Sequence, residues 1–162
     1  MLLFALYAGI AFALILSPVC RPFTDVLTRS TAEFSAAIIR LAGGHVDVSN
    51  QTLTAPQNGF SIAVVNGCNG INALLLLWAA QLAWPLAGWL EKLKRMGIGT
   101  AAILAANTFR IITLFYVGQW NRDWFEWMHL YVWEILIMLV GLAVFAAGAR
   151  QTPTPAAAGA AK

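Results

Sequence analysis

Long apolar stretches alternate with shorter polar ones along most of this chain. A helix needs about 20 apolar residues to cross the hydrocarbon core of a bilayer, and four stretches are long enough: about 2–19, 71–90, 97–119 and 128–149. The first has no Lys or Arg before it and no small-residue cleavage site, so we expect a retained span and not a signal peptide. The pattern predicts an all-α integral membrane protein with four transmembrane helices.

The segment between the first two spans, residues 20–70, has the periodicities of two further elements. Residues 24–42 place apolar side chains at helical spacing, and the two glycines that follow are typical of a helix end. These apolar residues are Leu27, Phe34, Ile38 and Leu41. Apolar and polar residues then alternate on both sides of the turn sequence PQNG: Val46 and Val48 before it, and Phe60, Ile62 and Val64 after it. We expect an amphipathic helix, packed on the bundle or lying on the membrane surface, and a small β-hairpin.

The composition agrees with a membrane protein. Hydrophobic residues make up 60% of the chain and charged residues 10%, whereas soluble domains average about 45–50% and about 25%. The formal net charge of +3 gives no case for nucleic-acid binding, because basic loop residues of membrane proteins report topology first. We expect one membrane domain over residues 1–150, surrounded by lipid, and a disordered cytoplasmic tail over residues 151–162. The oligomeric state stays open.

Basic residues predict the orientation in the membrane. We read the sequence EKLKR at 91–95 as a short loop, and its basic residues favour a cytoplasmic location for that loop. Arg150 and Lys162 favour the same side for the C-terminal end, whereas Arg21 favours the opposite orientation. Tryptophans are typical of membrane interfaces: Trp120, Trp124 and Trp127 fit the outer one, and Trp84 and Trp89 the inner one. We expect a multi-pass protein of the plasma (inner) membrane with both termini cytoplasmic and with residues 20–70 and 120–127 outside.

A lone thiol stands in a glycine-flanked turn, NGCNGIN, at the start of the second span. Cys68 acts as a nucleophile only as the thiolate, which a helix N-terminus favours. Strand, sharp turn, nucleophile and helix is also the order of the nucleophile elbow. The N–H groups of Asn69, Gly70 and Ile71 would then be donors for an oxyanion. The alternative is a buried structural cysteine in a helix cap.

The sequence NTFRI places a charge inside the third span. Arg110 lies about nine residues from the outer end, and an intramembrane arginine is by default a candidate functional residue. Asn107 is three residues earlier, on the same helical face. Glu134 enters the fourth span to a similar depth, so a structural ion pair with Arg110 is the alternative, and it is compatible with a functional role.

A histidine opens the fourth span. His129 would serve as a base for a thiol, because its ordinary pKa is close to neutral. A lone interfacial histidine is more often merely solvated, and His45 in the outer segment is the rival candidate. The location of His129 favours it over His45, because the predicted spans place His129, Cys68 and Arg110 toward the same outer leaflet.

This ordered trio resembles the exosortase/archaeosortase family. The resemblance covers about residues 66–135, and in length the chain is similar to the compact exosortase H subgroup, whose signals resemble IPTLxxWG. It implies a membrane cysteine transpeptidase with Cys68 as nucleophile, Arg110 as active-site arginine and His129 as general base. It implies partners that are exported proteins ending in a short motif, a transmembrane helix and a basic tail. The sequence has no metal cluster, phosphate loop or dinucleotide motif, so we expect no metal and no cofactor.

Two other classes of function stay open. A thiol–disulfide oxidoreductase would use Cys20 together with Cys68, since both are predicted on the oxidising side; the sequence lacks a C-x-x-C motif, however. A non-catalytic ion path would use Arg110 and Glu134, and four short spans would form one only as an oligomer.

Overall fold

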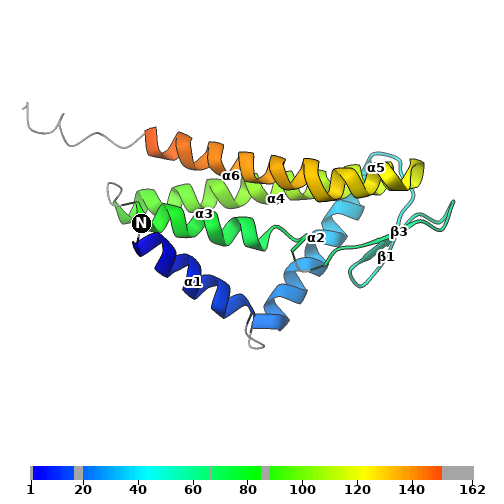
Figure 1. Ribbon diagram of the computed structural model, residues 1–162. Coiled ribbons are helices and arrows are strands. Elements are labelled where there is room, and N and C mark those ends of the chain that lie inside the picture. The colour runs from blue at the N-terminus through cyan, green and yellow to red at the C-terminus, as the bar shows by residue number, and fades with distance from the viewer. Residues whose placement is uncertain (1, 17–19, 66, 85–87, 151–162) are drawn as a thin grey trace, which may run out of the picture.

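The computed structural model describes residues 2–16, 20–65, 67–84 and 88–150, and Figure 1 shows their arrangement. The elements, in chain order, are α1 (Leu2–Leu16), α2 (Arg21–Leu41), β1 (Asp47–Ser49), β2 (Thr52–Thr54), β3 (Ser61–Ala63), α3 (Ile71–Ala83), α4 (Trp89–Trp120), α5 (Arg122–Trp127), a π-helical turn (Met128–Val132) and α6 (Trp133–Arg150). The chain is therefore mainly helical with one small sheet, as predicted.

Within the residues that the structure describes, two helices are long and apolar enough to cross a membrane. They are α4, with 32 residues, and the continuous helix formed by α5, the π turn and α6, with 29 residues. α3 packs against both, and α1 packs against α3. Since α3 has 13 residues, it is shorter than the length of about 20 that a span needs, and the count of four spans stays a prediction. The end of the first predicted span and the predicted tail, residues 17–19 and 151–162, lie outside the described residues.

The boundary predicted between the second and third spans is wrong. The second span was expected to reach residue 90, but α3 ends at Ala83, and the predicted basic loop at 91–95 forms the first turns of α4. Glu and Lys are good helix formers, and Arg95 Nε pairs with Glu91 Oε1 one turn earlier at 3.2 Å. Lys92 Nζ donates to the carbonyl of Leu82 at 2.8 Å. Lys92 therefore caps the end of α3 from within α4.

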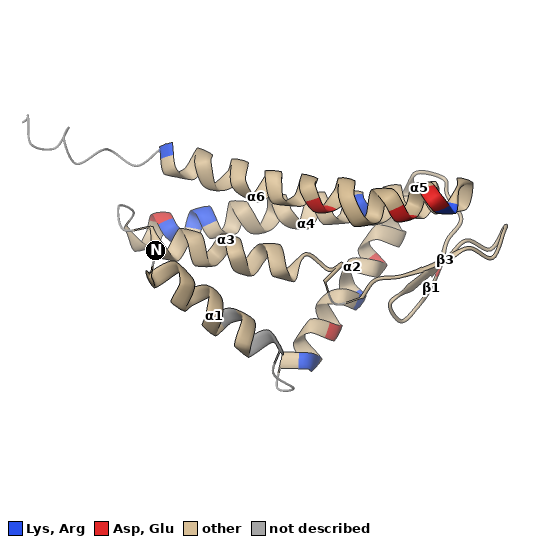
Figure 2. Cartoon of the chain, in the orientation of Figure 1, with Lys and Arg blue, Asp and Glu red and all other residues tan. Residues whose placement is uncertain are grey.

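The charges of the long helices gather toward their two ends. Figure 2 shows basic residues where α4 begins and α6 ends, both acidic and basic residues around α5, and charge-poor helix between. No charged residue occurs between Arg95 and Arg110 in α4, or between Glu134 and Arg150 in α6. This distribution suits a bilayer-spanning pair of helices.

α2 is a helix as predicted, but its buried face is different from the predicted one. Of the expected apolar stripe, Phe34 and Leu41 are 60% and 87% exposed. The buried face is made mainly of small residues: Thr24, Thr28, Thr31, Ala32, Ser35, Ala36 and Ile39. Small side chains let α2 pack closely on α4, and the threonine hydroxyls bond to carbonyls of their own helix, as Thr28 Oγ1 does to Thr24 at 2.7 Å.

The predicted hairpin is instead a three-stranded antiparallel sheet in the order β1-β2-β3. The stretch that was read as one strand turns back on itself at Asn50, which has a positive φ of 59°, so that β1 and β2 pair with each other. Asparagine tolerates this conformation better than most residues. Leu53 and Val64 from the sheet pack with Ile39 of α2 and with Ile111 and Phe115 of α4. This core fixes the sheet at one end of the helical bundle, on the same side as α5 (Figure 1).

Candidate active site

The turn that carries Cys68 depends on two glycines in left-handed conformations. Gly67 and Gly70 have φ values of 100° and 79°, which side chains other than glycine rarely adopt. The backbone N–H of Cys68 donates to Val65 O at 2.9 Å, and Gly70 is the N-cap of α3. A strand, a tight turn, the thiol and a helix therefore follow one another as the sequence predicts.

Asn69 ties this turn to two helices. Its Nδ2 donates to Thr28 Oγ1 of α2 at 3.0 Å, and its Oδ1 accepts from the backbone N–H of Ile71 at 3.2 Å. Asn69 is 1% exposed, so its side chain supports the turn from within the protein. The N–H of Ile71, expected to be free for an oxyanion, is occupied by Asn69, and that expectation is wrong.

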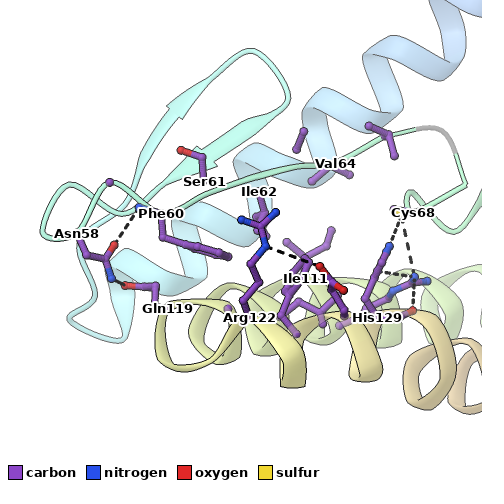
Figure 3. A pocket seen from close by; sticks show the side chains of 18 residues that line it. Asn58, Phe60, Ser61, Ile62, Val64, Cys68, Ile111, Gln119, Arg122 and His129 are labelled. Carbon is purple, nitrogen blue, oxygen red and sulfur yellow. Dashed lines mark hydrogen bonds and ion pairs between the residues drawn. The ribbon is translucent and has the colours of Figure 1, made fainter.

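Cys68, Arg110 and His129 come together from three elements (Figure 3). Cys68 Sγ lies 3.9 Å from His129 Nε2 and 4.0 Å from Arg110 Nη2. The same Nη2 lies 3.2 Å from His129 Nδ1. Arg110 and His129, which follow Cys68 by 42 and 61 positions in the sequence, therefore both lie next to its sulfur atom.

Arg110 is buried, and it is the centre of the polar contacts. It is 4% exposed, and besides the contacts to the thiol and the imidazole it bonds to the carbonyl of His129 at 3.4 Å. Its Nη1 lies 3.8 Å from Glu134 Oε2, which is the ion pair expected from the sequence. Among the described residues, its Nε has no hydrogen-bond partner. Glu134 is the half-exposed partner of this pair, so it only partly neutralises the buried guanidinium.

His129 lies in the π-helical turn, and its ring is held by an aromatic neighbour. Phe125, one turn earlier, stacks on the imidazole with ring centroids 5.7 Å apart and an angle of 14° between the planes. π-helical turns occur often at functional sites, since the extra residue changes where side chains point. Neither the π turn nor the stacking was predicted; the spacing of four residues between Phe125 and His129 is the only signal in the sequence.

The surroundings of the thiol favour its protonated form. Burial raises the pKa of the Cys68 thiol above its ordinary value; the Arg110 guanidinium lowers this pKa, and the Glu134 carboxylate raises it by a smaller amount. Desolvation is the larger effect, because it disfavours the charged thiolate. A nucleophilic role for this thiol would therefore need a base to take its proton, and the imidazole of His129 lies 3.9 Å away.

A cavity of about 650 Å³ opens from the thiol and runs along β3. Figure 3 shows β3 on one side of it and helices α4 and α5 on the other. Cys68, Arg110 and His129 line one end, Asn58 and Gln119 line the other, and Arg122 lies between them (Figure 3). Sequence reasoning missed this groove, because the turn sequence before β3 gives no sign of which helix it faces.

The remaining predicted residues lie around or away from this cavity. Asn107 is fully buried beneath Gly70, and a Cβ on Gly70 would lie 3.4 Å from Asn107 Cγ. In the part of the chain that the structure describes, neither Nδ2 nor Oδ1 of Asn107 has a hydrogen-bond partner. His45 is exposed in the loop before β1 and does not line the cavity. Cys20 caps α2, and both cysteines are free thiols. Within the described residues no group of His, Cys, Asp and Glu is arranged to hold a metal ion.

Comparison with known proteins identifies one family. The sequence model of that family, described as transmembrane exosortase (Exosortase_EpsH), matches residues 1–147. Comparisons with curated proteins and with solved structures give no match.

Proposed function

This chain belongs to the transmembrane exosortase family, and we propose that it is a cysteine transpeptidase that cleaves C-terminal sorting signals of exported proteins through a thioester on Cys68. The observation that carries the proposal is the convergence of Cys68, Arg110 and His129 at the end of a groove. A nucleophile, a base and a fixed positive charge within 4.0 Å of one another are the parts that acyl transfer needs.

The first step is proton transfer from Cys68 to His129. A guanidinium only donates hydrogen bonds, so in the contact with Arg110 the acceptor is His129 Nδ1 and the neutral ring carries its proton on Nε2. Nε2 accepts the thiol proton only after Arg110 has left Nδ1 and solvent in the cavity has taken the ring proton from Nε2 and returned one to Nδ1. A substrate carbonyl offers Arg110 another acceptor. Substrate binding therefore prepares the base.

The thiolate then attacks the carbonyl carbon of the scissile peptide bond. The carbonyl oxygen becomes an oxyanion, which Arg110 stabilises by hydrogen bonding and charge. When this intermediate collapses, the C–N bond breaks, the downstream amine takes the proton from His129 Nε2, and the upstream segment stays on Cys68 as a thioester. An acceptor amine attacks the thioester and restores the thiol, with water as the fallback.

The proposed orientation places this site on the extracytoplasmic side of the membrane. Basic residues where α4 begins and α6 ends favour a cytoplasmic location for that end of the bundle (Figure 2). The site and the sheet are at the other end, so both termini are cytoplasmic in a plasma (inner) membrane protein. Asn58→Cys and Lys94→Cys, each introduced into a chain that also carries Cys20→Ala and Cys68→Ala, test this by labelling in intact cells: only the cysteine at position 58 should react with an impermeant reagent.

The activity is tested with a sorting reporter, which we define as an exported protein that ends in an IPTLxxWG-type motif, a transmembrane helix and a basic tail. Co-expression with the wild-type chain should shorten the reporter just outside its helix. Cys68→Ala should abolish cleavage, and Cys20→Ala should not affect it. Equal loss in both variants would indicate a thiol–disulfide enzyme instead, and cleavage by Cys68→Ala would exclude the thiol mechanism.

A further inference from the structure

The groove beside Cys68 has an unpaired strand edge as one wall. β3 pairs with β2 on one side only, since the sheet order is β1-β2-β3. Its other edge lines the cavity: Ser61, Ala63 and Val65 are among the residues around that space. The cavity therefore exposes polar backbone of a strand next to a reactive thiol.

The hydrogen-bond register shows which backbone groups are free. Val64 N donates to Gln51 O, and Phe60 O accepts from Ala55 N, each at 2.8 Å, so residues 60 and 64 direct their backbone groups toward β2. In a strand these groups alternate sides from residue to residue. Ser61 and Ala63 therefore direct their N–H and C=O groups away from β2, and no described residue outside the sheet pairs with them.

We propose that the substrate binds as an added strand on this open edge of β3, parallel to it, and that this pairing delivers the scissile carbonyl to Cys68. The proposal rests on the proposed function, which supplies the peptide substrate. Strand addition gives affinity through the backbone, and the side chains on alternate residues of the peptide give specificity.

The direction of the added strand follows from the position of the thiol. β3 runs toward Cys68, which follows Ala63 by five positions. The transmembrane helix of the substrate follows the scissile bond and must lie in the membrane beside α4 and α6. The substrate segment before the scissile bond therefore extends over the sheet and, like β3, runs toward Cys68. Two strands that run the same way pair in parallel. One substrate residue then donates its N–H to Ser61 O and accepts at its C=O from Ala63 N.

The walls of the groove suit an extended, largely apolar peptide. Opposite the strand lie Ile111 and Leu114 of α4 and Phe125 of α5. Phe60 fixes the far end: its ring lies against the backbone of Gly118, where a Cβ would clash with it, and it packs edge-on against Phe125 at 6.0 Å. The groove is thus held open between a strand and two helices.

Photo-crosslinking tests this binding mode without chemistry. The Cys68→Ala chain carries p-benzoylphenylalanine in place of Ser61 or Ala63, both of which are exposed, and is co-expressed with the sorting reporter. Both positions should cross-link to the segment before the reporter's helix, with the adduct from position 61 two residues farther from the helix than that from position 63. The same probe at Ser49, in β1, is the control and should give no adduct.

A backbone substitution measures the contribution to processing. Ala63→Pro removes the N–H on the open edge and leaves the pairing with β2 intact. Val48→Pro is the matched control, because the register of β1 directs the Val48 N–H to the opposite edge of the sheet. Loss of one substrate hydrogen bond should slow reporter cleavage by Ala63→Pro about tenfold, and Val48→Pro should cleave at the wild-type rate. Gel filtration in detergent checks that both variants are folded.

The outcomes separate this inference from the proposed function. A wild-type chain that cleaves the reporter, with no adduct from positions 61 and 63 or with normal cleavage by Ala63→Pro, would overturn strand addition alone. Adducts in the reverse order would overturn the parallel direction. Adducts at these positions with no cleavage by the wild type would support the binding edge and refute the transpeptidase. Neither adducts nor cleavage would refute both.

Discussion

Arg110 and His129 are in direct contact, with Nη2 of the arginine 3.2 Å from Nδ1 of the imidazole and 3.4 Å from the histidine's own carbonyl oxygen. The contact joins α4 to the π-helical turn next to the thiol. It holds the imidazole with Nε2 facing Cys68 Sγ, and it keeps the guanidinium beside the place where a substrate oxygen would become charged.

Arg110→Lys should reduce reporter cleavage about 100- to 1000-fold, the usual cost of losing an oxyanion donor. A planar guanidinium contacts the thiol, the imidazole and Glu134 at once, whereas an ammonium is a single point charge. The rate of reporter cleavage in membranes measures the effect, and Arg29→Lys, a substitution in an exposed ion pair of α2, is the control. Near-normal cleavage by Arg110→Lys would reduce the role of Arg110 to general electrostatics.

Glu134→Gln should shift the alkaline limb of the pH–rate profile to lower pH. The carboxylate of Glu134 raises the pKa of the Cys68 thiol, so its removal lowers this pKa. Above this pKa the thiol proton is lost to solvent and His129 has no proton to give to the leaving amine, so cleavage declines from a lower pH. Cleavage of the reporter by the purified chain in detergent, followed across pH, measures the shift. Glu33→Gln on the exposed face of α2 should leave the limb in place. A shift to higher pH in Glu134→Gln would contradict the electrostatic account.

Thr28→Val should destabilise the turn that carries the thiol. The substitution removes the oxygen that accepts from Asn69 Nδ2, and a buried donor that loses its acceptor costs about 1–3 kcal/mol. Thr31→Val is the matched control, since its hydroxyl bonds only to Leu27 O of the same helix. The thermal unfolding midpoint in detergent and the cleavage rate should both fall in Thr28→Val and change much less in Thr31→Val. Equal effects of Thr28→Val and Thr31→Val would show that the hydrogen bond between Thr28 and Asn69 has no special role in the turn.

Gly70→Ala should lower stability by about 1–2 kcal/mol, because a Cβ is disfavoured in the left-handed conformation at the φ of 79°. Gly70→Asn should be milder, since asparagine tolerates that conformation. Gly97→Ala is the control: it lies within α4, where a Cβ would meet nothing within 4 Å. Chemical or thermal unfolding in detergent measures the stability of the three variants relative to the wild type. If Gly70→Ala were as stable as Gly97→Ala, the turn would not depend on that glycine.

The proximity of the candidate site residues could be predicted from the sequence, because these residues stand in helices or directly beside one. Arg110 lies inside an apolar span and Glu134 at a similar depth in the next, so an ion pair between them could be expected. A histidine at the start of a span must lie near the membrane interface. A cysteine between two glycines at a helix start indicates a turn. Helical spacing and membrane depth together bring these residues close, so few tertiary details are needed.

The features that were missed depend on packing that hydrophobicity does not report. Threonines and alanines of α2 face the protein while Phe34 and Leu41 face outward, so the apolar stripe indicated the wrong side. The start of α4 was taken for a loop, because charge alone does not distinguish a loop from a helical extension beyond the membrane. The groove depends on Phe60 meeting Gly118, a contact between residues far apart in the sequence.

The most direct measurement is mass spectrometry of Cys68 in the chain isolated after rapid acid quenching during turnover of the sorting reporter. The account predicts a peptide containing Cys68 with a thioester-linked addition, equal in mass to the reporter segment upstream of the cut and sensitive to hydroxylamine. The His129→Ala chain should lack this adduct. Reporter cleavage that proceeds with Cys68 unmodified throughout, and with no adduct under any acceptor concentration, would contradict the account.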